Sequence, residues 1–239
     1  MATAFPERII PDETSPGIVA LHLVRYVFAE QWCRDRDVLD AGCGAGYGSF
    51  HLSLVARTVV GGDVSADAIE YAQTHYGAPN LEFRVLDVTA LPFDDETFDV
   101  VCSFETIEHV DDAEALVREA ARVLRPGGTF VVSTPRAETT THAPENPFHQ
   151  IEFSRHDFER VLSSAFSSVD MYGERRLETA RHRALKRLDV LGLRRRSPLL
   201  RRASVLTGTR ETANLTLADV VVAPERVDEA DVLVAVCSR

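Results

Sequence analysis

Two glutamates and two histidines form the most unusual group of chemically active side chains in this 239-residue sequence. Glu105, Glu108 and His109 lie close together, and His149 follows about forty residues later. Carboxylates and imidazoles suit Mg²⁺ or Mn²⁺, and an imidazole can also remove a proton without a metal. The pattern leaves three alternatives open: a metal site, a general base at His109 or His149, or a loop that these residues only shape.

A second group surrounds three glycines at positions 42, 44 and 46. Glycines at a strand-to-helix junction permit positive φ and let a ligand lie against bare backbone. Asp40 ends the strand two residues before Gly42, and its carboxylate would repel a pyrophosphate but attract a cationic ligand. The loop therefore favours a cationic nucleoside ligand over a dinucleotide, and the sequence offers no hydride-transfer site for a dehydrogenase.

Two more aspartates follow predicted strands further along the chain. Asp63 comes 17 residues after Gly46, where a carboxylate can accept hydrogen bonds from both hydroxyls of a ribose. Asp87 and Val88 end the next strand, where they can receive an adenine amino group. Together with the glycines, these positions predict a nucleoside site.

The elements that must position these residues alternate between short β-branched runs and amphipathic stretches. This alternation predicts an α/β fold in which helices cover both faces of a mostly parallel sheet. Ligands of such sheets bind at the carboxyl ends of the strands, where both groups of residues fall. The predicted strands are residues 38–40, 58–63, 81–88, 98–105, 129–134, 168–172 and 231–237, and the predicted helices are 17–31, 48–55, 66–76, 111–124 and 158–165.

The composition fits one globular domain, with 45% apolar and 26% charged residues. Four scattered cysteines form no C-x-x-C pair and predict reduced thiols. The sequence shows no secretory signal and no apolar run of about 18 residues, so we expect a cytoplasmic protein without a transmembrane segment. The net charge of −11 argues against a nucleic-acid partner.

Positive charge is concentrated in residues 174–210, which hold 12 basic and 3 acidic residues. We interpret this segment as helical and consider four roles: a lid that binds an anionic acceptor, a peripheral membrane contact, an RNA contact, or a solvated helix face. RNA is disfavoured because no aromatic residues for base stacking alternate with the arginines.

The glycine loop from Asp40 to Gly48 resembles that of the class I S-adenosylmethionine-dependent methyltransferases, as do the strings at residues 91–93, 98–101 and 122–128. The resemblance implies a seven-stranded Rossmann-like sheet with an antiparallel last strand. It also implies one domain over residues 1–239, with an N-terminal helical cover (1–34), a cofactor-binding core (35–173), a basic helical insertion (174–218) and the last strand (219–239).

For the cofactor, S-adenosylmethionine, the resemblance implies a role for each matched position. Its methionine part would lie over the three glycines, its ribose on Asp63 and its adenine on Asp87. Tyr26 or Arg25 would touch its carboxylate, although Tyr26 could equally belong to the core. The predicted cofactor-binding residues are Tyr26, Asp40, Gly42, Gly44, Gly46, Asp63, Val64, Asp87, Val88 and Phe104.

The string Glu105-x-x-Glu108-His109 resembles the one that holds a divalent ion in ubiquinone-pathway O-methyltransferases and in small-RNA 3′-terminal 2′-O-methyltransferases. In the RNA group a later histidine completes the site, and His149 occupies a comparable place here. The sequence therefore predicts O-methylation of a small-molecule or sugar acceptor. A 2′-O-methyltransferase of RNA 3′ ends and a non-catalytic cofactor-binding partner protein remain the alternatives.

Overall fold

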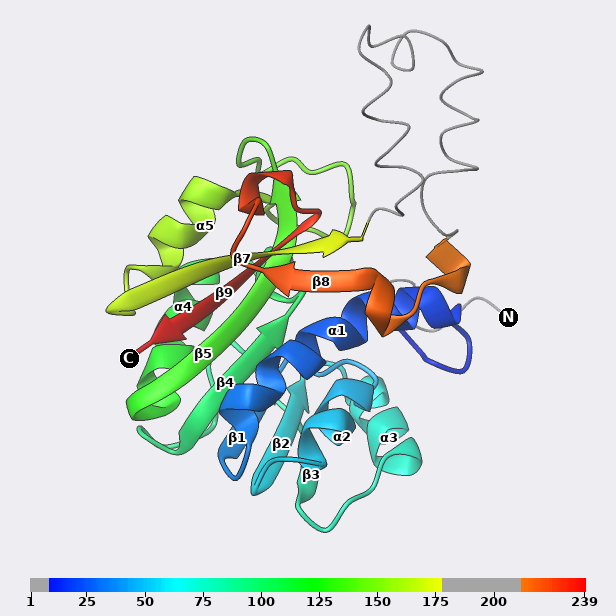
Figure 1. The fold of residues 1–239 in the computed structure, drawn as a ribbon. Coiled ribbons are helices and arrows are strands. Elements are labelled where there is room, and N and C mark those ends of the chain that lie inside the picture. Colours follow the sequence, from blue (N-terminus) through cyan, green and yellow to red (C-terminus); the bar gives the residue numbers. More distant parts are fainter. Residues whose placement is uncertain (1–8, 178–211) are drawn as a thin grey trace, which may run out of the picture.

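A mixed sheet of nine strands forms the centre of the molecule in the computed structural model, which describes residues 9–177 and 212–239 (Figure 1). Eight strands follow the order β3-β2-β1-β4-β5-β9-β7-β8, and β6 pairs with β5. The strands are β1 (Asp37–Ala41), β2 (Thr58–Asp63), β3 (Leu81–Val85), β4 (Phe98–Phe104), β5 (Leu124–Ala137), β6 (Phe153–Ser154), β7 (Ser168–Arg176), β8 (Val220–Ala223) and β9 (Val232–Ser238).

Strands β1 to β5 are mutually parallel, and β9 lies antiparallel between β5 and β7. The predicted α/β class and the antiparallel last strand are confirmed. Two strands were not predicted. The first, β6, is only two residues long, and the second, β8, is a short run of valines that lacks the alternation of a half-buried strand.

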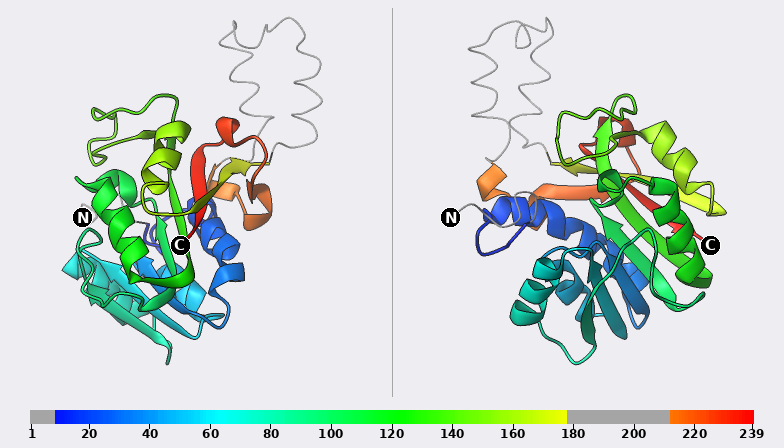
Figure 2. Two further views of the ribbon diagram at one scale, coloured as in Figure 1. Left: turned by 90° about the vertical axis from the view of Figure 1, so that its left-hand side faces the viewer. Right: turned by 180° about the vertical axis from the view of Figure 1, so that it is seen from behind.

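Helices cover both faces of the sheet, as the sequence predicts (Figure 2). One face packs against α1 (Pro16–Cys33) and α2 (Tyr47–Ser53), and α3 (Ala66–His75) adds a small cluster beside them. The other face packs against α4 (Ala113–Val123) and α5 (Arg155–Leu162). Burial of the strands on both faces explains their nearly continuous apolar sequences.

Side-chain caps fix where α3 and α5 begin. Ser65 accepts a hydrogen bond from the Ala68 N–H at the start of α3, as predicted. At the start of α5 the Ser154 hydroxyl accepts from the Asp157 N–H, so this helix begins at Arg155 rather than at residue 158. Caps of this kind satisfy backbone donors that the first turn of a helix leaves without partners.

The basic segment can be followed only at its edges, because residues 178–211 lie outside the described residues. Residues 174–176, predicted to be helical, belong instead to β7, where Glu174 pairs with Val232 and Arg176 with Val220. On the far side, Thr212–Asn214 and Leu217–Asp219 form single 3₁₀ turns. Among the described residues, no helix is both long and apolar enough to cross a bilayer.

Candidate functional site

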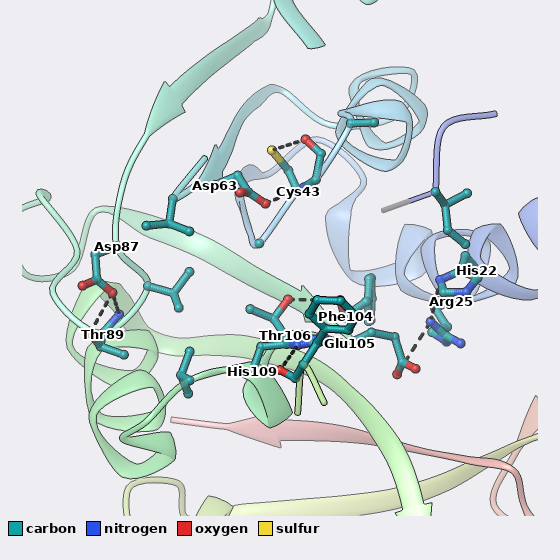
Figure 3. A pocket seen from close by; sticks show the side chains of 18 of the residues that line it. His22, Arg25, Cys43, Asp63, Asp87, Thr89, Phe104, Glu105, Thr106 and His109 are labelled. Atoms are coloured by element: carbon teal, nitrogen blue, oxygen red, sulfur yellow. Dashed lines mark hydrogen bonds and ion pairs between the residues drawn. The ribbon is translucent and has the colours of Figure 1, made fainter. Parts of the chain in front are cut away.

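A cavity of about 720 Å³ opens at the carboxyl ends of β1, β2 and β4. Its volume is in the range of ordinary small-molecule and cofactor sites. Figure 3 shows Asp63 and Asp87 on one side of it and Arg25 with Glu105 on the other, with Phe104 and His109 between them. Most of the predicted site residues therefore line one continuous cavity.

The glycine loop adopts left-handed backbone at three positions, with φ of 90° at Gly42, 53° at Gly44 and 86° at Gly46. Gly42 and Gly44 line the cavity, whereas Gly46 does not. A side chain at Gly46 would lie 2.6 Å from the Ala72 methyl and 2.8 Å from the Phe83 ring. Gly46 is therefore required for close packing beneath the loop, and Gly42 and Gly44 present bare backbone to a ligand.

Asp63 connects the glycine loop to the start of α3. Its two carboxylate oxygens accept hydrogen bonds from the Gly44 N–H at 3.0 Å and the Ser65 N–H at 2.9 Å. Asp63 lines the cavity although only 8% of it is exposed. Its carboxylate is thus held in a fixed position beside the place expected for the ribose.

The predicted adenine end lies on the neighbouring strand end. One oxygen of the exposed Asp87 carboxylate accepts from the backbone N–H and the hydroxyl of Thr89, at 2.8 and 2.7 Å. Val88 is buried, whereas Val64 is 71% exposed. An exposed valine and a fixed carboxylate facing one cavity suit a flat, partly polar ring.

Asp40 lies beneath the loop, fully buried, and does not line the cavity. Its carboxylate accepts hydrogen bonds from the Ser49 hydroxyl at 2.6 Å and the Tyr26 hydroxyl at 3.4 Å. Burial raises the pKa of Asp40 to about 7, although these two hydrogen bonds partly offset the effect. Asp40 therefore has no direct access to a ligand in the cavity, and its effect on a cationic ligand stays a prediction.

Tyr26 and Arg25, the candidates for the cofactor's carboxylate, both line the cavity. Tyr26 is also part of the core, because its ring covers Gly48 so closely that a side chain there would lie 1.9 Å from the Tyr26 Cζ. Phe104 packs edge-on against the same ring at 4.8 Å. Tyr26 thus belongs to the core and also lines the cavity, and its contact with the cofactor's carboxylate stays a prediction.

Arg25 is 2% exposed and lies between two carboxylates. Its Nε donates to Glu174 Oε2 at 2.6 Å, and its Nη1 lies 3.7 Å from Glu105 Oε1. Burial opposes the charge, but Glu105 and Glu174 raise the pKa of Arg25 above its ordinary value. Arg25 therefore remains charged and joins α1 to β7.

Glu105 does not join the other three residues of the predicted metal group. It follows β4 with φ of 50°, and its carboxylate accepts from the Ser133 hydroxyl at 2.8 Å on the side of Arg25. The left-handed backbone and these two partners hold its side chain beside Arg25. The predicted convergence of four ligands is therefore corrected to three.

Glu108, His109 and His149 do converge, each with one possible ligand atom within 4.8 Å of the others. Glu108 is 1% exposed, and its Oε2 accepts from the Thr134 hydroxyl at 3.0 Å. Its Oε1 is buried and has no hydrogen-bond partner among the described residues. Burial and then the nearby Glu105 raise the pKa of Glu108 well above its ordinary value.

Hydrogen bonds determine the tautomers of both histidines. His109 Nδ1 lies 3.0 Å from the Phe148 carbonyl, which can only accept, so Nδ1 carries the proton. His149 Nδ1 lies 3.1 Å from a carboxylate oxygen of Glu152, and its Nε2 lies 3.0 Å from the Asn146 amide nitrogen. In both neutral rings the lone pair is therefore on Nε2.

The residues that position the acceptor end by hydrogen bonds were not predicted from the sequence. Thr134 lies at the end of a strand whose length was underestimated, and Glu174 was assigned to the basic segment. Asn146 and Glu152 each lie three residues from His149 in the sequence. Only this spacing could have indicated that they contact His149.

Comparison with known proteins finds related sequences and related folds. Residues 39–132 match the family model described as a methyltransferase domain. A probable S-adenosylmethionine-dependent methyltransferase of Mycolicibacterium smegmatis is 39% identical over 168 residues, which cover 66% of this chain and 65% of that protein. One of Mycobacterium tuberculosis is 38% identical over 172 residues, 70% of this chain and 62% of the relative. The chain thus spans slightly less than two thirds of these relatives.

More distant matches include a ubiquinone biosynthesis O-methyltransferase of Rhizobium rhizogenes, 35% identical over 52% of this chain and 53% of that protein. Among solved structures, a chain of the complex between the Haloferax volcanii Trm112 methyltransferase activator and a putative methyltransferase has a TM-score of 0.63. It is 22% identical, and the match covers 93% of this chain and 92% of that one.

The YcgJ protein of Bacillus subtilis has a TM-score of 0.59 at 19% identity, with 91% of this chain and 97% of that chain covered. These structures support the fold, and the sequence matches support the family, which implies S-adenosylmethionine as the cofactor. The chain belongs to the class I S-adenosylmethionine-dependent methyltransferases.

Proposed function

We propose that this chain transfers the methyl group of S-adenosylmethionine to an oxygen of a small-molecule or sugar acceptor. One observation carries the proposal. The same cavity that is lined by Asp63 and Asp87 at its nucleoside end is lined by His109 at its other end. A cofactor held at the first end would direct its methyl group toward an acceptor at the second.

In this proposal the bare backbone of Gly42 and Gly44 supports the methionine part of the cofactor, Asp63 holds the ribose, and Asp87 receives the adenine amino group. Arg25, charged and lining the cavity, would attract the cofactor's carboxylate while it stays bound to Glu174. Neither Gly46 nor Asp40 lines the cavity. In this proposal Gly46 allows the close packing that shapes the loop, and Asp40 influences the ligand electrostatically through the loop.

Methyl transfer requires few catalytic groups at the acceptor end. A methyl group on a sulfonium is already activated, so the protein must align the acceptor oxygen with it and see that one proton leaves. His109 lines the cavity with its Nδ1 proton donated to Phe148, so in this tautomer Nε2 is the nitrogen that would accept a proton. Without a metal, His109 would be the base.

The three converging residues also fit a divalent ion. One polar atom of each is hydrogen-bonded, to Thr134, Phe148 and Glu152 respectively, so the ligand atoms would be Glu108 Oε1, His109 Nε2 and His149 Nε2. Metal-binding histidines characteristically donate their other N–H in this way. Bound there, Mg²⁺ or Mn²⁺ would orient the acceptor oxygen and lower its pKa.

The acceptor's charge and the protein's location remain predictions from the sequence. An anionic acceptor or a peripheral membrane contact would rely on the basic segment, most of which lies outside the described residues. The described rim of the cavity carries Asp111 and Asp112, so it offers no reason of its own to expect an anion.

Two measurements test the proposal. Isothermal titration calorimetry with S-adenosylhomocysteine should show binding that Asp63→Ala weakens. Transfer of a labelled methyl group should then be assayed on catechols, hydroxybenzoates, monosaccharides, nucleotide sugars and short RNA, with EDTA and with added Mn²⁺. Loss of transfer in EDTA and recovery with Mn²⁺ would support the ion, and transfer that resists EDTA but is lost in His109→Ala would support the base.

Other outcomes contradict the proposal. Absence of cofactor binding would reject the nucleoside assignment. Methylated nitrogen in the product would reject the acceptor atom, and methylation of RNA alone would favour the alternative of an RNA 2′-O-methyltransferase. Tight cofactor binding without transfer to any acceptor would favour a non-catalytic partner protein.

A further inference from the structure

The segment Asn146–Glu152 places a hydrogen-bond donor on the one nitrogen of His149 that could bind a metal. The Asn146 side chain is oriented by the Phe148 N–H, which donates to its Oδ1 at 3.1 Å, and this leaves Nδ2 facing His149 Nε2 at 3.0 Å. Because an amide nitrogen only donates, Nε2 must be the acceptor in this contact. The orientation of the amide and the tautomer of the ring therefore support each other.

Glu152 fixes the opposite side of the same ring. Its carboxylate accepts from His149 Nδ1 at 3.1 Å, and its backbone exchanges two hydrogen bonds of 3.0 Å with Thr141. The His149 side chain is only 10% exposed, so the ring has little freedom to turn away. Glu152 thus fixes the ring with its lone pair on Nε2, and one ring nitrogen of His149 lies within 4.8 Å of a possible ligand atom of Glu108 and of His109.

We propose that Asn146 competes with a divalent ion for His149 Nε2, and that Glu152 is the positioning residue that holds this nitrogen toward the ion. The inference rests on the proposed ion site at Glu108, His109 and His149. One lone pair cannot accept the Asn146 proton and bind a metal at the same time. Ion binding must therefore displace the Asn146 amide, and the strength of this hydrogen bond subtracts from the ion's affinity.

Substitutions of Asn146 and Glu152 should change Mn²⁺ affinity in opposite directions. A merely structural role for either residue would not produce this pattern. Asn146→Ala should tighten Mn²⁺ binding by about 3- to 10-fold, because it removes a competing hydrogen bond. Glu152→Gln should weaken it by about 10-fold or more, because the ring loses its charged partner.

The experiment uses the full chain and measures free Mn²⁺ by electron paramagnetic resonance, so that no acceptor is needed. Gln150→Ala and Glu145→Gln serve as matched controls, since both are exposed residues of the same loop and remove an amide and a charge respectively. Neither control should change Mn²⁺ affinity. Asn146→Ala should also lose its effect in a His149→Ala background, because the competition acts through that ring.

The outcomes separate the two proposals. If the wild type binds no Mn²⁺, the ion site of the proposed function is wrong and the competition falls with it. If the wild type binds Mn²⁺ but Asn146→Ala binds it equally or more weakly, the ion site stands and the competition is overturned. Should Asn146→Ala fail to fold, Asn146→Leu has a side chain of similar size, offers His149 no donor, adds no metal ligand, and should again bind Mn²⁺ more tightly.

Discussion

The two ends of the cavity are held together in different ways. At the cofactor end each functional carboxylate stands at the end of its own strand and accepts from nearby backbone, as Asp63 does from Gly44 and Ser65. At the acceptor end, His109 takes its partner from Phe148, 39 residues away, and His149 is held by its own loop. Strand ends position the first set, whereas a loop between β5 and β6 positions the second.

Because different elements position the two ends, we expect substitutions to affect cofactor binding and turnover separately. Substitutions at the strand ends should change cofactor affinity, and substitutions in or against the loop should change turnover or ion binding. Each prediction below tests whether the two ends respond independently, beginning with the largest expected effect.

His109→Ala should lower turnover by about 10²- to 10⁴-fold, the usual contribution of a positioned proton acceptor, and leave S-adenosylhomocysteine affinity nearly unchanged. The methyl-transfer assay and calorimetry measure the two quantities. His142→Ala, in an exposed part of the same loop, is the control and should change neither. An equal loss of cofactor affinity in His109→Ala would show that the two ends do not act separately.

Asp63→Ala should weaken S-adenosylhomocysteine binding by about 10- to 150-fold, the usual worth of hydrogen bonds to a charged group. The loss would combine the direct contact with loosening of the loop at Gly44. Asp67→Ala removes the same charge from an exposed position in α3 and should have no such effect. Unchanged calorimetric affinity in a folded Asp63→Ala protein would remove Asp63 from the ribose site.

Asp40 and Asp37 lie on the same strand and should respond oppositely to loss of charge. Burial raises the pKa of Asp40 to about 7, so the folded state holds its proton more tightly than the unfolded state, and ionisation costs stability as pH rises toward 7. Relative to the wild type, Asp40→Asn should therefore gain about 1 to 2 kcal/mol in unfolding free energy between pH 5.5 and 8.

The hydrogen bond from Arg57 lowers the pKa of Asp37, so its contribution is fully present above about pH 4 and is lost only in more acidic solution. Asp37→Asn should consequently be less stable than the wild type by a constant amount from pH 5.5 to 8. Urea unfolding without cofactor at the two pH values measures both variants. Parallel curves for Asp40→Asn and the wild type would mean that Asp40 is already ionised at pH 5.5.

The local elements of the cofactor end could be predicted from the sequence because each depends on neighbouring residues. Strand β2 was predicted with its observed bounds, and Asp63 at its end lines the cavity. A strand, a glycine turn and a helix cap are each determined by neighbouring residues, so their side chains follow once the sheet order is known.

The acceptor end was predicted only by residue type. The proximity of Glu108 and His149 depends on how residues 138–152 fold back, and no periodic pattern describes that path. Glu105 was wrongly placed with them because sequence spacing does not reveal a left-handed backbone at a strand end. The bond from Glu174 to Arg25 joins elements 149 residues apart and depends on sheet order alone.

Phe148→Ala should have the smallest effect of these substitutions. It tests whether the backbone or the ring of Phe148 positions His109. The carbonyl that holds His109 and the N–H that orients Asn146 belong to the backbone and persist in the variant. The ring is 45% exposed and lines the cavity, so its loss should cost less than about 1 kcal/mol of folding stability and raise the acceptor KM by less than about 10-fold. Leu217→Ala, similarly exposed outside the cavity, should leave KM unchanged. A fall in kcat comparable to that of His109→Ala would instead mean that the ring, and not the backbone, keeps the histidine in place.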